Sequence, residues 1–267
     1  GTVIFEKNAD ERREVASITK LMTALLVLEA LDRDEIALTD SVQISPRAAA
    51  MKGSQALLDA SAVYPLEDLL RTTIMASAND SAVALSEYIA GSEENFVDRM
   101  NRRAAELGMT NTNYVNCTGY PQSGQYTTAR DVCRLCCEIA KHPRYNQYAS
   151  VWIDKLIHPG GRVTDLTNTN RLVRFYEGCD GYKTGSTDAA KYCLAATAEK
   201  NGMRLVAIVL GTPVSQTRFN EARQMLDYGF ATYRRVVIAN KGDLLGQNVE
   251  VRGGSAESVP LALGSGL

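Results

Sequence analysis

The stretch EVASITKLMTALLVLEALD, residues 14–32, decides the fold because it joins a long apolar helix to a polar head. From Lys20 onward, apolar residues recur at three- and four-residue steps, with good helix formers between them and no Gly or Pro. So many apolar positions leave little exposed face, and we therefore expect a buried helix. The tetrad Ser17-Ile18-Thr19-Lys20 at its start needs an explanation.

Two interpretations of Ser17 fit this tetrad. As an N-cap, its hydroxyl would accept a hydrogen bond from the first turn, and an acidic residue would be expected three positions later. Lys20 stands there instead, although the helix dipole disfavours a cation at this end. Because positions i and i+3 share a face, the alternative is a catalytic pair. Burial and the dipole would lower the pKa of Lys20, and its neutral amine could take the proton of Ser17.

Composition places the chain among ordinary globular proteins of one large domain or two smaller ones. It has 267 residues, of which 45% are hydrophobic and 22% charged, and a formal net charge of −2. This balance gives no electrostatic footprint for nucleic acid and no basic run for an anionic membrane surface. We therefore expect no nucleic-acid partner.

The two ends of the sequence indicate processing. No run reaches the roughly 18 apolar residues of a spanning helix, and no signal peptide opens the chain. The start, GTVIFEKN, is typical of the second half of a strand-turn unit, so we expect a processed or trimmed product. Such processing is consistent with export.

The six cysteines do not form a convincing metal site. DVCRLCCEIAKH is typical of one amphipathic helix that buries small apolar cysteines, and the only histidines are His142 and His158. We expect free buried thiols, no metal and no cofactor, and we leave disulfides open. The cysteines are Cys117, Cys133, Cys136, Cys137, Cys179 and Cys193.

The middle of the chain is predicted to be helical. Residues 65–90 carry apolar residues at helical spacing, with an interruption from Ala76 to Asp80. A further amphipathic helix follows over residues 94–109 and closes on Gly108.

The C-terminal part changes to strands. YCLAATAE and RLVAIVLG flank the turn Lys200-Asn201-Gly202, which predicts a hairpin, and a helix follows over residues 215–233. We expect an α+β fold in which strands from both ends of the chain form one sheet. Residues 1–239 would be one domain, and the Gly-rich residues 240–267 the start of a small β domain.

Three polar motifs follow one another in a fixed order. Ser17-x-x-Lys20 heads the buried helix, Ser77-Ala78-Asn79 lies in the helix interruption, and Lys183-Thr184-Gly185 precedes the hairpin. This order is the signature of the active-site serine penicillin-recognising enzymes.

The surrounding sequence narrows the resemblance to one family. KNADERREVASITKLMTALL, IMASANDSAVALSEYIAG, GQYTTARD, GYKTGST and RFNEARQMLDYGF resemble the low-molecular-mass D-alanyl-D-alanine carboxypeptidases of the penicillin-binding protein 5 type. The resemblance runs from Val3 to about Tyr233. It implies a β-lactamase/transpeptidase-like domain with an antiparallel sheet flanked by helices and a mainly helical subdomain. In that family a small β domain and a membrane-anchoring amphipathic helix follow, so we expect membrane contact only through such an anchor.

The resemblance implies a role for each motif residue. Ser17 would attack the carbonyl of the penultimate D-alanine of a peptidoglycan stem pentapeptide, with Lys20 as the base, and β-lactams would acylate the same serine. Ser77 would pass a proton to the leaving amine, while Asn79 would hold the substrate amide and the Lys20 ammonium. Lys183 would add positive potential.

The strand of the third motif would bind the substrate backbone and its carboxylate. Residues 183–185 would pair with the extended peptide, which would explain why Gly185 lacks a side chain. The family's oxyanion hole would use the backbone N–H groups of Ser17 and Ser186. Thr184 and Arg218 are candidates for the substrate carboxylate, although Arg218 could equally be an exposed residue at a helix start.

Two positions depart from the family. Asn116 to Tyr120, with the sequence NCTGY, replace a segment that often contains His-Gly-Leu, and Ser186 stands where relatives carry His, Tyr or Phe. Both changes affect the expected specificity and deacylation rate more than the reaction class.

Three alternatives remain in view. A class A β-lactamase would need a Glu, usually followed closely by Leu-Asn, between the second and third motifs, and no Glu there has that context. A catalytically silent cell-wall scaffold would keep the fold without turnover. D,D-endopeptidase activity on cross-links would use the same residues. Because the substrate lies outside the cytoplasm, we expect an exported protein.

Overall fold

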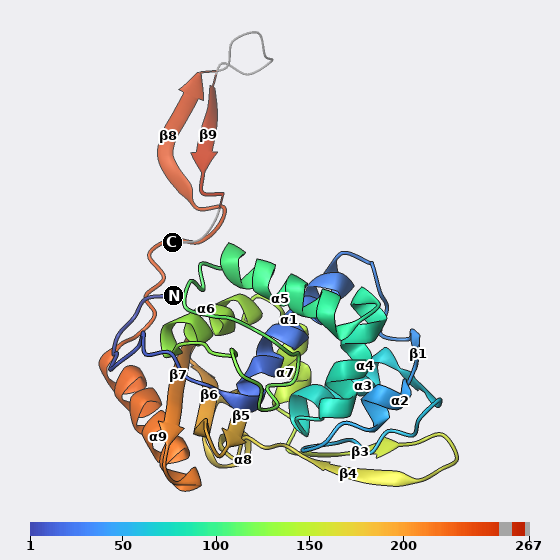
Figure 1. Ribbon diagram of the computed structural model, residues 1–267. Coiled ribbons are helices and arrows are strands. Elements are labelled where there is room, and N and C mark those ends of the chain that lie inside the picture. The colour runs from blue at the N-terminus through green and yellow to red at the C-terminus, as the bar shows by residue number, and fades with distance from the viewer. Residues whose placement is uncertain (251–257, 265–267) are drawn as a thin grey trace.

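The computed structural model describes residues 1–250 and 258–264 and shows an α+β fold (Figure 1). A three-stranded antiparallel sheet has the order β5-β6-β7 and the bounds Cys179–Thr187, Lys191–Lys200 and Met203–Thr212. The two-residue turn Asn201-Gly202 joins β6 to β7, and both of its residues have positive φ, as the predicted hairpin requires.

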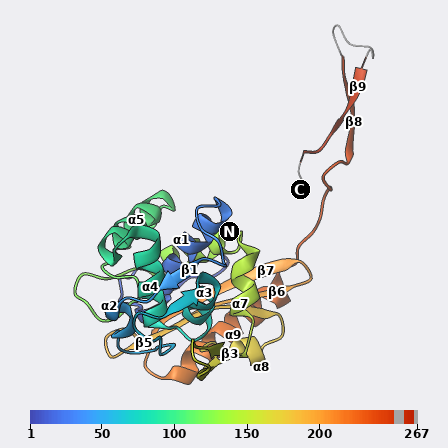
Figure 2. The same cartoon turned by 90° about the vertical axis from the view of Figure 1, so that its right-hand side faces the viewer.

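Helices cover both faces of this sheet. On one face lie α8 (Leu172–Phe175) and α9 (Ser215–Thr232), which bury a small apolar cluster against the strands. The larger core lies on the other face, between the sheet and the remaining helices (Figure 2). These helices are α1 (Lys20–Asp32), α2 (Pro46–Ala49), α3 (Leu66–Met75), α4 (Asn79–Ala90), α5 (Glu93–Glu106), α6 (Ala129–Ile139) and α7 (Pro143–Ala149).

Helix α1 lies at the centre of the larger core, as predicted. Leu21, Met22, Leu25 and Leu28 are at most 1% exposed. A short 3-10 helix, η1 (Ala16–Thr19), precedes α1 and packs against β5. The polar tetrad is therefore held between the central helix and the edge strand of the sheet.

The predicted helix interruption is confirmed. Helix α3 ends at Met75, α4 begins at Asn79, and Ser77 between them has φ of 63°, in the left-handed region. Helix α5 is followed by Gly108 with φ of 69°, which agrees with the predicted helix end.

The predicted N-terminal strand of the sheet is wrong. Residues 1–6 form no strand. A Cβ on Gly229 of α9 would lie 3.2 Å from Cδ1 of Ile4, so this segment is placed by side-chain packing beside α9 and not by a hydrogen-bonded ladder.

Three small two-stranded antiparallel sheets complete the described chain. The two that lie within the main body pair β1 (Ser41–Gln43) with β2 (Val63–Pro65), and β3 (Ile153–Ile157) with β4 (Val163–Thr167). The third pairs β8 (Leu244–Glu250) with β9 (Ser258–Ala262) and stands away from the rest in both views (Figure 1, Figure 2). No described helix is long and apolar enough to cross a membrane.

All six cysteines are free thiols in the structure. Cys133 and Cys137 are only half-buried on α6, so the expectation of buried thiols is wrong for these two. Their positions on the predicted amphipathic helix account for this, because they flank its buried stripe of Val132, Leu135 and Cys136.

Candidate active site

Ser17 and Lys20 are in direct contact at the junction of η1 and α1. Lys20 Nζ donates to Ser17 Oγ at 3.0 Å and to the carbonyl oxygen of Thr118 at 2.8 Å. Ser17 lies inside the 3-10 turn, while Val15 and Thr19 occupy the N-cap positions of η1 and α1. The structure therefore excludes the N-cap interpretation of Ser17.

The environment of Lys20 favours its neutral form. The side chain is 1% exposed, and desolvation lowers its pKa to about 7, against an opposing influence of Cys117 and Asp80. At neutral pH about half of a lysine population with this pKa is uncharged and can accept a proton. The pair thus has the geometry and the acidity of a nucleophile and its base.

The helix interruption brings Ser77 and Asn79 into buried positions. Ser77 is 3% exposed, and Asn79, at the start of α4, is 5% exposed. Asn79 Nδ2 donates to the carbonyl oxygen of Lys52 at 2.6 Å, whereas its Oδ1 is buried without a partner among the described residues. An unpaired buried acceptor is costly, so Oδ1 is a candidate for accepting a substrate N–H group.

The predicted contact between Asn79 and the Lys20 ammonium is not among the hydrogen bonds of the described chain. The ammonium donates to Thr118 and Ser17 instead, and the Asn79 amide nitrogen is occupied by Lys52. The carbonyl of Thr118 has thus taken the position that we assigned to the amide oxygen.

Lys183 is buried on β5 and places a second amine in the site. It is 1% exposed, and desolvation, Lys20 and Arg218 all lower its pKa well below the usual value. Its Nζ donates to the carbonyl oxygen of Thr184 at 3.2 Å. Strand β5, which carries Lys183, packs against η1, which carries Ser17, so the first and third motifs meet in space.

Gly185 brings β5 against η1. A Cβ at this position would lie 2.3 Å from the carbonyl oxygen of Val15 and 3.1 Å from the backbone nitrogen of Ser17. The space for a side chain is therefore taken by the backbone of Val15 and Ser17. This corrects the predicted reason for the glycine, which was the approach of a substrate strand.

The Thr184 hydroxyl meets a residue that the sequence did not single out. Thr184 Oγ1 donates to Thr169 Oγ1 at 2.7 Å, and the backbone N–H of Thr169 donates to the carbonyl oxygen of Met75 at 3.2 Å. Thr169 therefore links β5 to the end of α3, just before Ser77. Only the folded structure reveals the role of Thr169, because no local sequence pattern marks this threonine.

Arg218 is buried on α9 and is not the exposed helix-start residue that we had kept as an alternative. It is 8% exposed, and its Nη1 donates to the carbonyl oxygens of Gly185 and Cys193 at 3.0 and 3.1 Å. Its guanidinium lies over the ring of Tyr192, and its buried Nε has no partner among the described residues. Ser186 is exposed and directly follows Gly185, whose carbonyl oxygen accepts from Arg218.

Two further polar residues support the site from behind. Asn116 Oδ1 accepts from the backbone N–H groups of Thr118 and Gly119 at 3.2 and 2.7 Å, which fixes the loop that presents the Thr118 carbonyl to Lys20. Asp80 accepts from the backbone N–H groups of Ala56 and Leu58. Asp80 directly follows the motif residue Asn79, but its partners lie 24 and 22 residues away in the sequence, whereas Asn116 binds the next residues of its own loop.

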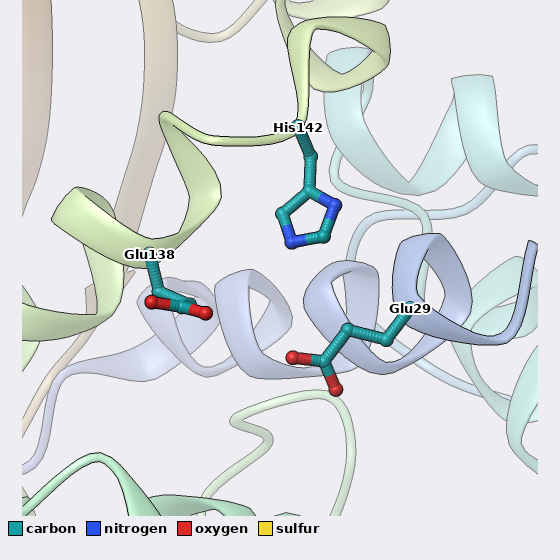
Figure 3. A group of neighbouring side chains, drawn as sticks. All are labelled: Glu29, Glu138 and His142. Carbon is teal, nitrogen blue, oxygen red and sulfur yellow. The ribbon is translucent and has the colours of Figure 1, made fainter. Parts of the chain in front are cut away.

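The described residues contain one group with the spacing of a metal site, and it lies apart from Ser17. Glu29 of α1 and Glu138 and His142 of the α6 region point toward one another (Figure 3). Arg103 already bridges the two carboxylates, with Nη2 at 2.7 and 3.0 Å from their oxygens. This arginine supplies the positive charge between them, so we assign the group to tying α1, α5 and α6 together.

Comparison with known proteins agrees with this geometry. A family described as D-alanyl-D-alanine carboxypeptidase matches residues 1–214. DacF of Bacillus subtilis, a D-alanyl-D-alanine carboxypeptidase, is 39% identical over 98% of this chain and 67% of its own length. DacC of Escherichia coli, of the same description, is 36% identical over 88% of this chain and 60% of its own length, so the chain spans about two thirds or less of these relatives.

Solved structures extend the similarity to the fold. Penicillin binding protein 5 from Haemophilus influenzae has a TM-score of 0.87 and 31% identity, covering all of this chain and 77% of that one. The DD-transpeptidase of a Streptomyces strain has a TM-score of 0.79 and 29% identity over 86% of this chain and 93% of its own. The transpeptidase-like fold expected from the sequence is confirmed, and the chain belongs to the D-alanyl-D-alanine carboxypeptidase family of penicillin-binding proteins.

Proposed function

We propose that this chain hydrolyses the bond between the two terminal D-alanines of peptidoglycan stem pentapeptides through an acyl-enzyme on Ser17. The observation that carries the proposal is the contact of 3.0 Å between Lys20 Nζ and Ser17 Oγ, made by a lysine whose pKa is lowered to about 7. β-Lactams would acylate the same oxygen.

Acylation begins with proton transfer from Ser17 Oγ to neutral Lys20. The oxygen attacks the D-alanyl carbonyl, and the backbone N–H groups of Ser17 and Ser186 stabilise the oxyanion. The close packing of β5 on η1, which Gly185 permits, supports this arrangement because it brings the two backbone segments together. Ser77 then passes a proton to the leaving amine, and water hydrolyses the ester.

Substrate binding uses the free edge of the sheet. β5 is an edge strand, so residues 183–185 can pair with an extended peptide, and Asn79 Oδ1 can accept from its amide. Thr184, Ser186 and Arg218 would bind the terminal carboxylate. The negative charge of that carboxylate would favour the protonated form of Lys183, which would then add positive potential. The unpartnered Nε of Arg218 supports this assignment.

Two alternatives are weaker. Of the carboxylates between the second and third motifs, Glu93 pairs with Arg47 and accepts from the N–H of Cys117, and Glu138 pairs with Arg103, which leaves neither to activate water as a class A β-lactamase requires. The pKa of buried Lys20 near 7 also argues against a silent scaffold, because such shifts cluster at catalytic sites and a scaffold does not need a neutral lysine.

We also propose that residues 1–239 form the catalytic domain and that residues 240–267 open a β-rich second domain. The enzyme would act outside the cytoplasm, where its substrate is found. A C-terminal anchor of the kind common in the family would supply its only membrane contact.

Intact mass after incubation with penicillin G tests the proposal. We expect a long-lived increase equal to one penicillin in the parent and in Ser123→Ala, an exposed-loop control, and none in Ser17→Ala. Release of D-alanine from a pentapeptide should be lost in the same variant. Rapid destruction of penicillin without an adduct would identify a β-lactamase instead, and intact penicillin without an adduct would identify a silent scaffold.

A further inference from the structure

Asp80 is a buried carboxylate that has no role in the proposed mechanism. It follows Asn79 in the first turn of α4 and is 0% exposed. The helix dipole favours a negative charge there, but full burial is costly unless the carboxylate has hydrogen-bond partners. Its Oδ1 accepts from the backbone N–H groups of Ala56 at 3.0 Å and Ser81 at 2.9 Å, and its Oδ2 accepts from that of Leu58 at 3.1 Å. Two of these three donors come from a segment that is distant in sequence.

That segment is the loop of residues 51–60, which contains no helix or strand. Ala56 and Leu58 are buried, whereas Leu57 between them is 52% exposed and has φ of 62°, in the left-handed region. Buried backbone N–H groups outside helices and sheets need another acceptor, which here is the side chain of Asp80. Asp80 therefore fixes the path of the 51–60 loop beside the start of α4.

The same loop holds Asn79 through its backbone. The carbonyl oxygen of Ser54 accepts from the backbone N–H of Asn79 at 2.7 Å, and that of Lys52 accepts from Asn79 Nδ2 at 2.6 Å. A Cβ on Gly53, between these two residues, would lie 2.8 Å from Asn79 Nδ2, so the loop backbone packs directly on the amide. Because the loop occupies Nδ2, it sets the orientation of the amide, and the buried Oδ1 is left without a partner among the described residues.

We propose that Asp80 is a positioning residue that acts through the 51–60 loop to hold the Asn79 amide with Oδ1 free for a substrate N–H group. The inference rests on the proposed function, in which Asn79 binds the substrate amide. Without the carboxylate, the N–H groups of Ala56 and Leu58 lose their acceptor, and the backbone that carries the Lys52 carbonyl is no longer fixed. The amide of Asn79 then loses its orientation, and substrate binding weakens.

A second influence of Asp80 has to be separated from this one in any test. Desolvation lowers the pKa of Lys20 to about 7, and both Cys117 and Asp80 oppose this shift. Removing the charge of Asp80 would therefore lower the pKa of Lys20 further and change the rate near neutral pH. At pH 9 the amine of Lys20 is neutral with or without Asp80, so a rate measured there reports on binding and orientation.

A double-mutant cycle with Asp80→Asn and Asn79→Ala, measured at pH 9, tests the proposal. Asparagine keeps the size of the side chain, but its Nδ2 cannot accept a hydrogen bond from the loop. In Asp80→Asn we expect kcat/KM for a D-alanine-terminated peptide to fall about 3- to 10-fold, mainly through a higher KM. When Asn79 is already alanine, the same substitution should change kcat/KM by less than about twofold.

The matched control is Ser81→Ala, at the next position of α4. Ser81 is equally buried, and its hydroxyl lies 2.7 Å from Oγ1 of Thr72 on α3. The control loses a buried hydrogen bond, so its Tm should fall while its KM stays within about twofold of the parent value. If Asp80→Asn does not fold, Asp80→Glu takes its place in the cycle. This variant keeps the charge but displaces the oxygens from the two loop N–H groups, so the same dependence on Asn79 is expected.

Two results would overturn the role of Asp80. Either the substitution lowers kcat/KM equally with asparagine and with alanine at position 79, or KM in the Asp80 variant equals that of the parent. Failure of the underlying function gives a different result, since the parent itself would then neither release D-alanine nor form a penicillin adduct.

Discussion

The pKa of one residue, Lys20, controls the rate of the proposed reaction. Burial lowers its pKa to about 7, and only the neutral amine can take the proton of Ser17. We expect the penicillin acylation rate to rise as pH increases from 6 to 8, with a midpoint near 7. Stopped-flow measurement of acylation checks the profile.

The control for this profile is Lys20→Arg. A guanidinium stays protonated throughout this range, so the variant should acylate about 10²- to 10⁴-fold more slowly and show no midpoint near 7. A parent rate that does not change between pH 6 and 9 would contradict the role of Lys20 as base.

Thr169 gives a second prediction at the residue scale. Thr169→Val removes the acceptor of the Thr184 hydroxyl while keeping the side-chain volume. Loss of one such hydrogen bond is worth about 0.5–1.5 kcal/mol, so KM for a D-alanine-terminated peptide should rise by roughly 2- to 10-fold, with kcat changing less. Steady-state kinetics measure the split. An unchanged KM, equal to that of the exposed control Thr167→Val, would show that the contact does not position Thr184.

The site residues that belong to motifs in a known order could be predicted from the sequence. The site residues that are defined by contacts between distant parts of the chain could not. Ser17, Lys20, Ser77, Asn79 and Lys183 could be singled out because each belongs to a short motif. Thr118 contacts Lys20 through its backbone carbonyl group. Every residue type has such a group, so the sequence does not mark this position. Its contact with Lys20 spans 98 residues of sequence, so only the folded chain reveals it.

At the scale of elements, the packing of β5 on η1 brings the proposed nucleophile, Ser17, against the proposed substrate-binding strand. Gly185→Ala would place a Cβ 2.3 Å from the carbonyl oxygen of Val15, so one element must shift. Overpacking of this kind costs about 1–3 kcal/mol, and we expect Tm to fall by about 2–10 °C and acylation to slow. Calorimetry and penicillin binding provide the two measurements. Gly264→Ala is the control, because nothing lies within 4 Å of its added Cβ.

An equal Tm for Gly185→Ala and Gly264→Ala would show that η1 can move away from β5 without cost. In that case the close approach would not define the oxyanion hole.

Helices were easier to predict than strands in this chain. A helix such as α1 is specified by its own periodicity, and the break before Asn79 by loss of that periodicity. A strand needs a partner, and the apolar start of the chain has none in the sheet, since Ile4 packs beside α9. The β3–β4 hairpin was not predicted. Its strands, IDKLI and VTDLT, are short and each buries a single residue, so they lack a clear alternation of apolar and polar positions.

At the scale of the whole molecule, the β8–β9 hairpin is predicted to be independent of the catalytic region. Its closing hydrogen bonds, from Gly242 to Leu263 and from Leu263 to Asp243, lie within the hairpin, and Leu244 is 68% exposed. Ending the chain at residue 239 should therefore change Tm by less than about 2 °C and penicillin acylation by less than about twofold. Ending it at Met225 removes the buried Leu226 of α9 and should prevent stable folding. If the two truncations proved equally destabilising, the proposed boundary near residue 240 would be wrong, and the hairpin would be part of the catalytic domain.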